Sequence, residues 1–403
     1  MASNNIQITV NKEIKMASKI EWDKDFLNEE KEFVTEYIET GVVGFDLAIS
    51  NGKGLPIGGC ILMYSGKGSG KSTLCADIAR RMLEKHEAAK IPYQCLYIDV
   101  EGGSKGLALN TGLSKFVSKE HGRRLIYRKS KKTTWNDIEN LFKAILDGDE
   151  HVKDVKLVVI DSLSVIMSET MADEKKTINA GDFGSGAKDR GTLFNKYLLE
   201  LKSKGVTFLL IAQQRQKQGA TQFEDQKRAA TSDTDDHIVD CILKLTRSGG
   251  GNDKETKKVE VVSAATGEKE KVAIYFYCSI QAPEKNRFYA GLPRVKVLMK
   301  TGQGVVNTYT MRNLLIHNKL LKIGGSAQKP KVTINDELLS FVNSAEPFVQ
   351  ESNVKETNAW ITNNMGAIRE FLKSKNKYRL IEDIKDLQDR LDQEEFETDG
   401  EEE

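Results

Sequence analysis

Short runs of consecutive apolar residues alternate along this chain with segments in which apolar residues recur every three or four positions. The runs predict buried strands and lie at residues 60–64, 94–100, 155–160 and 206–212. The periodic segments predict helices and lie at residues 71–86, 134–146 and 193–201. Because strands that are apolar throughout need cover on both faces, the alternation predicts an α/β fold with a mainly parallel sheet flanked by helices.

The pattern changes after residues 241–245. Polar and apolar residues alternate over residues 272–278 and 295–299, which predicts antiparallel strands that extend one edge of the sheet. The glycine-rich and charged stretch at residues 248–258 is predicted to be the loop of a hairpin. Residues 323–331, which contain two glycines and a proline, are predicted to be a linker.

Helical spacing in the last part of the chain, around residues 338–342 and 360–372, predicts a small C-terminal helical region. The first 40 residues are too few to build a core of their own, so their apolar side chains are expected to pack on the main domain or on another copy of the chain. The predicted parts are therefore an N-terminal arm (1–40), a core (41–322), a C-terminal helical region (323–392) and an acidic tail (393–403).

The composition is that of a globular protein in a reducing compartment. Of 403 residues 39% are hydrophobic, and the net charge of +1 conceals basic clusters that offset the acidic C-terminus. This balance neither supports nor excludes nucleic acid as a partner. The five cysteines are scattered and form no C-x-x-C pair, so we expect buried thiols. Without an apolar run of membrane-spanning length or a signal-peptide core, we expect a cytoplasmic protein, in the host cytoplasm if the source is viral.

The strongest chemical signal joins the first predicted strand to the first predicted helix. Nine residues there have the composition of a phosphate-binding loop: Ser65, Gly66, Lys67, Gly68, Ser69, Gly70, Lys71, Ser72 and Thr73. Glycines let successive backbone N–H groups face an anion, the helix N-terminus adds partial positive charge, and Lys71 can reach the terminal phosphates. Ser65 stands where the motif has its first glycine. We predict a site for a nucleoside triphosphate, with ATP as the cofactor.

Three polar residues follow the carboxyl ends of other predicted strands, where parallel sheets bind ligands. Asp161 is expected to hold Mg²⁺ together with the Ser72 hydroxyl. Glu101 can orient and deprotonate the water that attacks the terminal phosphate. Gln213 can bind the terminal phosphate and transmit its loss to the segment that follows. The alternatives are an N-cap aspartate, a solvated loop glutamate and a polar residue at a strand end.

Two segments between these strands have the composition of basic, glycine-containing loops. The candidate residues for contacts with nucleic acid are Gly181, Phe183, Gly186, Lys188 and Arg190 in the first, and Arg215, Lys217, Phe223, Lys227 and Arg228 in the second. Basic loops with an aromatic residue beside a nucleotide site can close on a nucleic-acid backbone. Ordinary surface loops are the alternative. A further basic run at residues 123–132 is interpreted as a solvated face, with a second stripe that follows nucleic-acid phosphates as the alternative.

Together these motifs resemble those of the RecA/RadA family of DNA strand-exchange recombinases, with the nearest likeness to the bacteriophage UvsX type. The likeness runs from about residue 40 to residue 304 and includes the segments around Glu101, Asp161 and Gln213. Its most specific part is Glu284-Lys-Asn-Arg287. The resemblance implies a RecA-like fold and an ATP-dependent recombinase that forms helical filaments on single-stranded DNA and catalyses homologous pairing and strand exchange.

The same resemblance implies roles for further parts of the chain. Lys285 and Arg287 would reach the ATP of a neighbouring copy and act in catalysis with Lys71, Glu101 and Gln213. Residues 181–190 and 216–236 would be the two DNA-binding loops, the arm would pack on the adjacent protomer, and the acidic tail would restrain access of DNA. Expected partners are single-stranded and duplex DNA, further copies of the chain, a single-strand-binding protein and a loader.

The sequence departs from the family at three places. The first is Ser65, which replaces the first glycine of the phosphate-binding loop. The second is at Ala108 and Thr301, which stand where bacterial RecA has tyrosines that stack on adenine. The third is in the second loop, which has Ala229-Ala230 in place of a glycine pair. Two other classes of protein stay open. A hexameric DNA helicase of the same fold would also use cations from a neighbour, and an ATP-dependent switch without motor activity would hydrolyse ATP without a response to DNA.

Overall fold

The structure, a computed structural model, describes most of the chain between residues 36 and 379. The described residues are 36–101, 110–129, 133–168, 172, 185–216, 227–229, 237–248, 258–262, 269–273, 275–289, 291, 294–326, 329–345 and 347–379. They belong, except for Glu36, to the second of two units of the chain, Tyr37–Glu403. Most of the predicted arm and the whole predicted acidic tail lie outside them.

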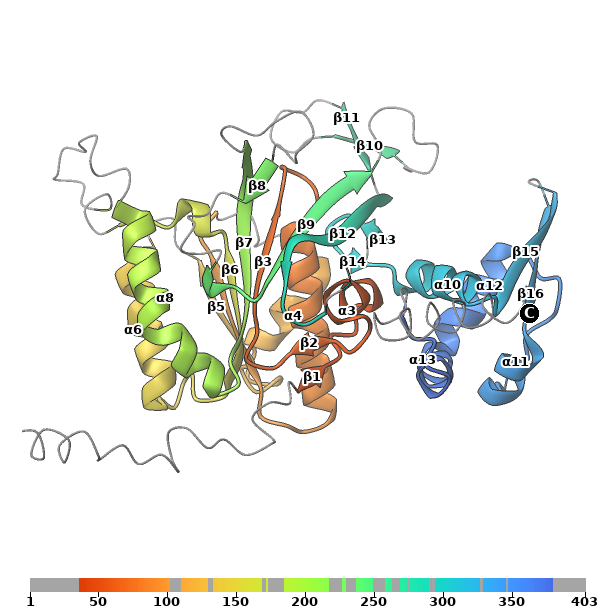
Figure 1. Cartoon of the computed structure of the whole chain (residues 1–403), viewed down its shortest axis with the longest axis horizontal. Helices are drawn as coiled ribbons and strands as arrows, with labels where there is room; N and C mark the ends of the chain where they lie inside the picture. The colour runs from red at the N-terminus through yellow and green to blue at the C-terminus, as the bar shows by residue number, and fades with distance from the viewer. Residues whose placement is uncertain are drawn as a thin grey trace, which may run out of the picture. The chain divides into compact units, whose positions relative to one another are not determined.

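A mainly parallel sheet lies at the centre of this unit (Figure 1), with its strands in the order β14-β13-β12-β9-β3-β7-β6-β4-β5 and with β8 (Lys227–Ala229) beside β7. The parallel strands are β3 (Cys60–Ser65), β4 (Gln94–Asp99), β5 (Leu125–Lys129), β6 (Val155–Asp161), β7 (Thr207–Gln216) and β9 (Cys241–Ser248). The antiparallel strands at the edge are β12 (Tyr275–Asn286), β13 (Val295–Lys300) and β14 (Gly304–Val305). Both features confirm the prediction.

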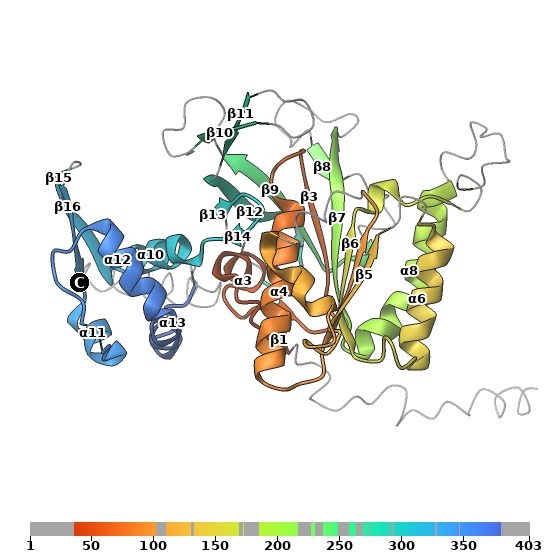
Figure 2. The ribbon, with the colours of Figure 1, turned by 180° about the vertical axis from the view of Figure 1, so that it is seen from behind.

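Strand β3 shows why the apolar runs do not alternate with polar residues. Ile61 and Met63 belong to one apolar cluster, which includes residues of α3 (Val43–Ser50) and α4 (Lys71–Ala88). Leu62 and Tyr64 belong to a second cluster, with residues of α6 (Trp135–Asp147) and α8 (Ser185–Ser203). Since successive side chains of a strand point to opposite faces, the sheet is covered on both sides. Figure 2 shows α4 and the α6–α8 pair on opposite sides of β6 and β7. The five cysteines are buried free thiols, as predicted.

Local hydrogen bonds set the ends of α6 where the sequence predicts them. Thr134 and Asp137 form a capping box: the Thr134 hydroxyl accepts from the Asp137 N–H (3.3 Å), and the Asp137 carboxylate accepts from the Thr134 N–H (3.0 Å). At the other end, Gly148 has a φ of 72°, a conformation that glycine adopts without strain, and its N–H closes the last turn.

Two predictions were wrong. Residues 323–331 are not a linker, because they lie in an antiparallel hairpin of β15 (Leu321–Ser326) and β16 (Lys329–Ile334). Glycine and proline are tolerated there because this two-stranded ribbon has unpaired edges. Residues 272–278 are not one strand: β11 (Lys269–Ala273) pairs with β10 (Lys258–Val262), and β12 begins separately at Tyr275. Alternation predicts a strand but does not say which partner it has.

The C-terminal elements pack on the core. They are α10 (Asn307–His317), α11 (Asp336–Val342), α12 (Val354–Asn363) and α13 (Met365–Ser374). Buried residues of α12 and α13, such as Ile361 and Phe371, belong to the same apolar cluster as α3 and α4. Ahead of α3, Glu39 accepts a hydrogen bond from Arg369 (2.8 Å) and pairs with Lys373 of α13. Among the described residues, none of the helices combines the length and the apolar character that crossing a membrane requires.

Candidate functional site

The loop between β3 and α4 has the backbone of a phosphate-binding loop. Gly68 and Gly70 have φ values of 74° and 93°, in the left-handed region that favours glycine. A Cβ on Gly70 would lie 2.8 Å from the Met299 sulfur and 3.1 Å from Cζ of Phe276, so the chain has no room for a larger residue there. Gly70 is the N-cap of α4 and its carbonyl accepts from the Leu74 N–H (2.8 Å), which directs the first N–H groups of the helix toward the loop.

A cavity of about 670 Å³ opens over this loop. It is lined by Ser65, Gly66, Lys67, Gly68, Ser69, Gly70, Lys71, Ser72, Thr73, Glu101, Asp161, Ile211, Gln213 and Gln214. All nine predicted loop residues thus line one cavity together with Glu101, which follows β4, Asp161, the last residue of β6, and Gln213, which lies within β7. The volume is in the range of small-molecule and cofactor sites.

Lys71 points back into the loop. Its Nζ donates to the Ser65 carbonyl (3.1 Å), the Ser65 hydroxyl (2.9 Å) and the Gly66 carbonyl (3.3 Å). Burial lowers the pKa of Lys71, while the negative charges of Asp161 and Glu101 act in the opposite direction. An anion with several negative oxygens would offer this ammonium group stronger partners than neutral carbonyls.

Asp161 and Ser72 form the pair predicted to hold a divalent cation. Asp161 is 3% exposed and its carboxylate accepts from the Ser72 hydroxyl and from the Tyr97 hydroxyl, the latter at 3.4 Å. The pKa of Asp161 is raised to about 6: burial is the main cause and the charges of Glu101 and Asp99 add to it, while the hydrogen bond from Ser72 and the charge of Lys71 act in the opposite direction. Within the described residues no three acids, histidines or cysteines cluster as a complete metal site. One carboxylate and one hydroxyl suit Mg²⁺, which takes its other ligands from phosphates and water.

Glu101 is held by two side chains that come from different strands. Its Oε1 accepts from the Ser162 hydroxyl (2.8 Å) and from Gln213 Nε2 (3.1 Å). The backbone N–H of Gln213 in turn donates to the Ser164 hydroxyl (3.2 Å). The structure therefore links Glu101 and Gln213 directly, a contact that the sequence did not suggest. Ser162 and Ser164 were missed, although both follow Asp161 at the end of an apolar run.

A second group that the sequence missed supports the tip of the loop. Arg247, near the end of β9, donates to the Gly68 carbonyl (3.2 Å), and its guanidinium lies 4.5 Å from the centre of the Phe276 ring. Phe276 and Met299 come from the antiparallel strands β12 and β13 and fill the space beside Gly70. A single arginine on an edge strand carries no sequence signal that distinguishes it from other surface cations.

Lys285 and Arg287 lie away from this cavity. Lys285 Nζ donates to the His237 carbonyl (3.3 Å), and His237 precedes β9, whose first residue pairs with Ile61 at the beginning of β3. Arg287 Nη1 lies 3.4 Å from Asp240 Oδ1, and the other oxygen of this carboxylate accepts from the Cys60 N–H (2.9 Å). Both cations are thus at the amino edge of the sheet. About 13 Å of strand separates the level of Ile61 from the loop that follows Ser65.

The predicted DNA-contacting residues are only partly described. Gly181, Phe183, Lys217 and Phe223 lie outside the described residues, and Lys227 and Arg228 are described by their backbone. Gly186, Lys188 and Arg190 are not in a loop but in the first turns of α8. Lys188 is exposed, whereas Arg190 is 6% exposed with its guanidinium 5.8 Å from the centre of the Trp135 ring.

The second predicted loop begins as a β-ribbon. Arg215 lies in β7 and pairs with Arg228 of β8 (Lys227–Ala229). Gln213 is in the same strand, two residues before Arg215, so a displacement of Gln213 would be carried along β7 into this ribbon. Strand β7 therefore connects a residue of the cavity lining, Gln213, with the ribbon that carries Arg215.

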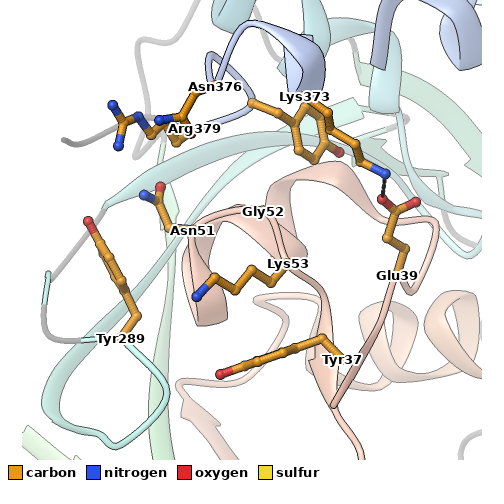
Figure 3. A pocket seen from close by; sticks show the side chains of 10 residues that line it. Tyr37, Glu39, Asn51, Gly52, Lys53, Tyr289, Lys373, Asn376 and Arg379 are labelled. Atoms are coloured by element: carbon orange, nitrogen blue, oxygen red, sulfur yellow. Dashed lines mark ion pairs between the residues drawn. The ribbon is translucent and has the colours of Figure 1, made fainter. Parts of the chain in front are cut away.

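A separate pocket of about 430 Å³ lies between the core and the end of α13 (Figure 3). Its lining includes Tyr37, Lys53, Tyr289 and Arg379, together with the Glu39–Lys373 pair that joins the two regions. Lys53 Nζ lies 5.6 Å from the centre of the Tyr37 ring. Beside this pocket the Glu39–Lys373 pair joins the segment ahead of α3 to α13.

The fold and the loop together define an α/β protein of the phosphate-binding-loop class. Comparison with known proteins agrees with this class: residues 50–189 match the family model described as an AAA domain. Protein RecA of Mycoplasma genitalium is 26% identical over 195 residues, which cover 48% of this chain and 51% of that protein. Protein RecA of Mycoplasma pneumoniae is 26% identical over 202 residues, which cover 49% and 52%. The chain thus spans about half the length of the curated relatives it matches, and the similarity supports a RecA-like core.

Proposed function

We propose that this chain is a DNA-dependent ATPase that forms helical filaments on single-stranded DNA and catalyses homologous pairing and strand exchange in recombination and repair. The observation that carries the proposal is the single cavity in which Lys71, Asp161, Glu101 and Gln213 converge on a phosphate-binding loop. The similarity to RecA proteins over half of the chain supports the choice of reaction. The cofactors in this proposal are ATP and Mg²⁺.

Each group of the cavity has a chemical task in this reaction. Ser72 and Asp161 would hold Mg²⁺, which when bound neutralises charge on the phosphates. Lys71 exchanges its carbonyl partners for phosphate oxygens. Glu101, fixed by Ser162 and Gln213, orients the attacking water and takes its proton. The side-chain amide of Gln213 has two N–H donors, so one could bind the terminal phosphate while the other holds Glu101, which would link the two groups when nucleotide is bound.

Lys285 and Arg287 have a task in this proposal only if a second copy is present. Their position at the amino edge of the sheet keeps them from the loop of their own chain. In a filament built by head-to-tail contacts, the amino edge of one copy faces the nucleotide of the next, so the two cations would complete a shared site. Assembly and catalysis would then depend on each other.

The DNA contacts are proposed from charge and connectivity. The ribbon of β7 and β8 carries Arg215, Lys227 and Arg228, and its first strand contains Gln213. Loss of the terminal phosphate would release Gln213 and loosen the ribbon, which couples hydrolysis to DNA affinity. Contacts to phosphates make binding tolerant of sequence and sensitive to salt. The likeness to the UvsX type, the packing of the arm on an adjacent protomer, the restraining role of the acidic tail, and the single-strand-binding and loader partners stay predictions.

Steady-state ATP hydrolysis with and without single-stranded DNA, at low and moderate salt, tests the proposal. We expect strong stimulation by DNA that is lost in Glu101→Gln and in Lys285→Ala. The matched control is Lys153→Ala, since Lys153 is an exposed lysine paired with Glu150 far from the cavity lining. An ATP hydrolysis rate that is the same with and without DNA would refute the proposal and favour an ATP-dependent switch. Closed rings instead of open filaments under the electron microscope would favour a hexameric helicase.

A further inference from the structure

Ser65 replaces the first glycine of the phosphate-binding loop, and the backbone explains why a side chain is tolerated. Glycine is needed where φ is in the left-handed region, which in this loop applies to Gly68 and Gly70. Ser65 is not among the residues with positive φ and is the last residue of β3. It is 1% exposed, so its hydroxyl is held inside the loop and needs hydrogen-bond partners there.

The Ser65 hydroxyl takes part in several hydrogen bonds within the loop. It accepts from Lys71 Nζ (2.9 Å), contacts the Ser69 hydroxyl, and can donate to the Gly66 carbonyl (3.1 Å). The other two partners of Lys71 are the Ser65 and Gly66 carbonyls. A carbonyl oxygen can only accept, whereas a hydroxyl rotates and can donate as well. Of the three groups that bind Lys71, the hydroxyl is therefore the one that can also bind an anion.

The hydroxyl lies on the side of the cavity where a terminal phosphate is expected. Ser65 is the direct neighbour of Gln213 in the register of β3 and β7. The Gln213 side chain donates to Glu101 (3.1 Å), and Lys71 Nζ donates to the Ser65 hydroxyl. Ser65 is thus a neighbour of both groups, Lys71 and Gln213, that the proposed function assigns to the terminal phosphate.

We propose that the Ser65 hydroxyl is an additional phosphate-binding group, which donates a hydrogen bond to the terminal phosphate and thereby favours the triphosphate over the diphosphate. The inference rests on the proposed ATP site. A diphosphate has no acceptor at that position, so the hydroxyl keeps its partners within the loop and contributes nothing to the affinity. A glycine at position 65 could not supply this donor.

The test is calorimetric titration of the full chain, with Mg²⁺, by ADP and by a non-hydrolysable ATP analogue. In Ser65→Gly the triphosphate analogue should bind about 5- to 30-fold more weakly, as expected for a lost hydrogen bond to a charged group. The affinity for ADP should change by less than about twofold. Glycine is the residue of the motif itself, so this variant is expected to fold, which thermal unfolding verifies. Ser65→Thr keeps the hydroxyl and should keep the preference for the triphosphate.

The outcomes separate this inference from the proposed function. Equal losses for both nucleotides would mean that Ser65 only shapes the loop, and unchanged affinities would mean that it has no role in binding; either result overturns the inference. Lys71→Ala is the positive control and should weaken both ligands. If the unaltered chain hydrolyses ATP in response to DNA while Ser65→Gly keeps its preference for the triphosphate, the inference alone fails. If the unaltered chain binds neither nucleotide, the proposed function fails with it.

Discussion

Two variants that are each inactive should restore activity when they are mixed, if Lys285 acts on the nucleotide of a neighbouring copy. The first variant is Lys285→Ala, which keeps Glu101. The second is Glu101→Gln, which keeps Lys285 and an intact loop for nucleotide binding. Removal of a cation from a transferring phosphate, or of the group that positions water, is expected to leave less than about 1% of the activity in either variant alone.

The structure sets the size of the expected recovery. Lys285 is bound at the amino edge, beyond the level of Ile61, and about 13 Å of strand lies between that level and the loop of the same chain. A lysine side chain does not span this distance, so each site needs two copies. In a random one-to-one mixture, half of the sites have an intact Glu101, and half of those face an intact Lys285. About one quarter of the unaltered activity should return.

The assay is steady-state hydrolysis at saturating single-stranded DNA, with the total chain concentration held constant while the ratio of the variants changes. A matched mixture of Lys153→Ala with Glu101→Gln serves as control, because Lys153 has no place in either half of the site. That mixture should give about one half of the unaltered activity, since every intact Glu101 then has a competent neighbour. The curve for the test mixture should peak at equal amounts of the two variants.

A mixture no more active than the average of its components would refute the reasoning. It would mean that Lys285 serves its own chain after a rearrangement, or that it has no part in the reaction and only binds the His237 carbonyl. The control mixture should give about one half of the activity whether or not the Glu101→Gln chains enter the filaments, so it measures only the effect of dilution. Co-sedimentation of labelled Glu101→Gln chains with Lys285→Ala chains on single-stranded DNA distinguishes a refutation from a failure to assemble.

Three further predictions concern stability. Gly70→Ala should lower the free energy of unfolding by about 1–2 kcal/mol or more, because both the left-handed φ and the contact with Met299 oppose a Cβ. Gly66→Ala is the control: Gly66 has open space around it and no positive φ, so chemical denaturation should show little change in the free energy of unfolding. Burial raises the pKa of Asp46 to about 7, so between about pH 4 and pH 7 the folded chain holds a proton that the unfolded chain has lost. The free energy of unfolding therefore falls as the pH rises through this range. Asp46→Asn should have a higher melting temperature than the unaltered chain at pH 8, by a difference that vanishes near pH 4. Thr134→Ala should cost about 1 kcal/mol through the lost cap of α6 without changing ATP hydrolysis, and an unchanged melting temperature would contradict the role of the capping box.

The parallel core of the sheet and the phosphate loop could be predicted from the sequence because each rests on a local rule. An apolar run must be a buried strand when helical segments flank it, and glycines before Gly-Lys-Ser have few other uses. The strand pairing at the edge of the sheet could not be predicted in this way. Alternation at residues 272–278 is compatible with either β11 or β12, and their partners are set by register, which is a property of the whole sheet.

The site residues that lie at the ends of predicted strands could be predicted from the sequence, because the strand ends could be. Asp161, Glu101 and Gln213 follow apolar runs and do line one cavity. The residues that orient them could not be found in this way, since Ser162, Ser164 and Arg247 are common residue types whose importance comes from what lies opposite them. The glycines and proline of residues 323–331 are typical of linkers, so the sequence predicts no hairpin there, and the buried side chains of β15 and β16 are too few to form a visible period.

The apolar cluster that α12 and α13 share with α3 has a consequence for how the chain folds. Glu39 is bound by Arg369 and Lys373, and residues more than three hundred positions apart share one apolar cluster. Removal of α12 and α13 would therefore leave the half-buried Glu39 carboxylate without its two cations and would expose apolar side chains of the core to water. This apolar cluster is therefore complete only after ribosomal synthesis has passed Tyr378, its last described member.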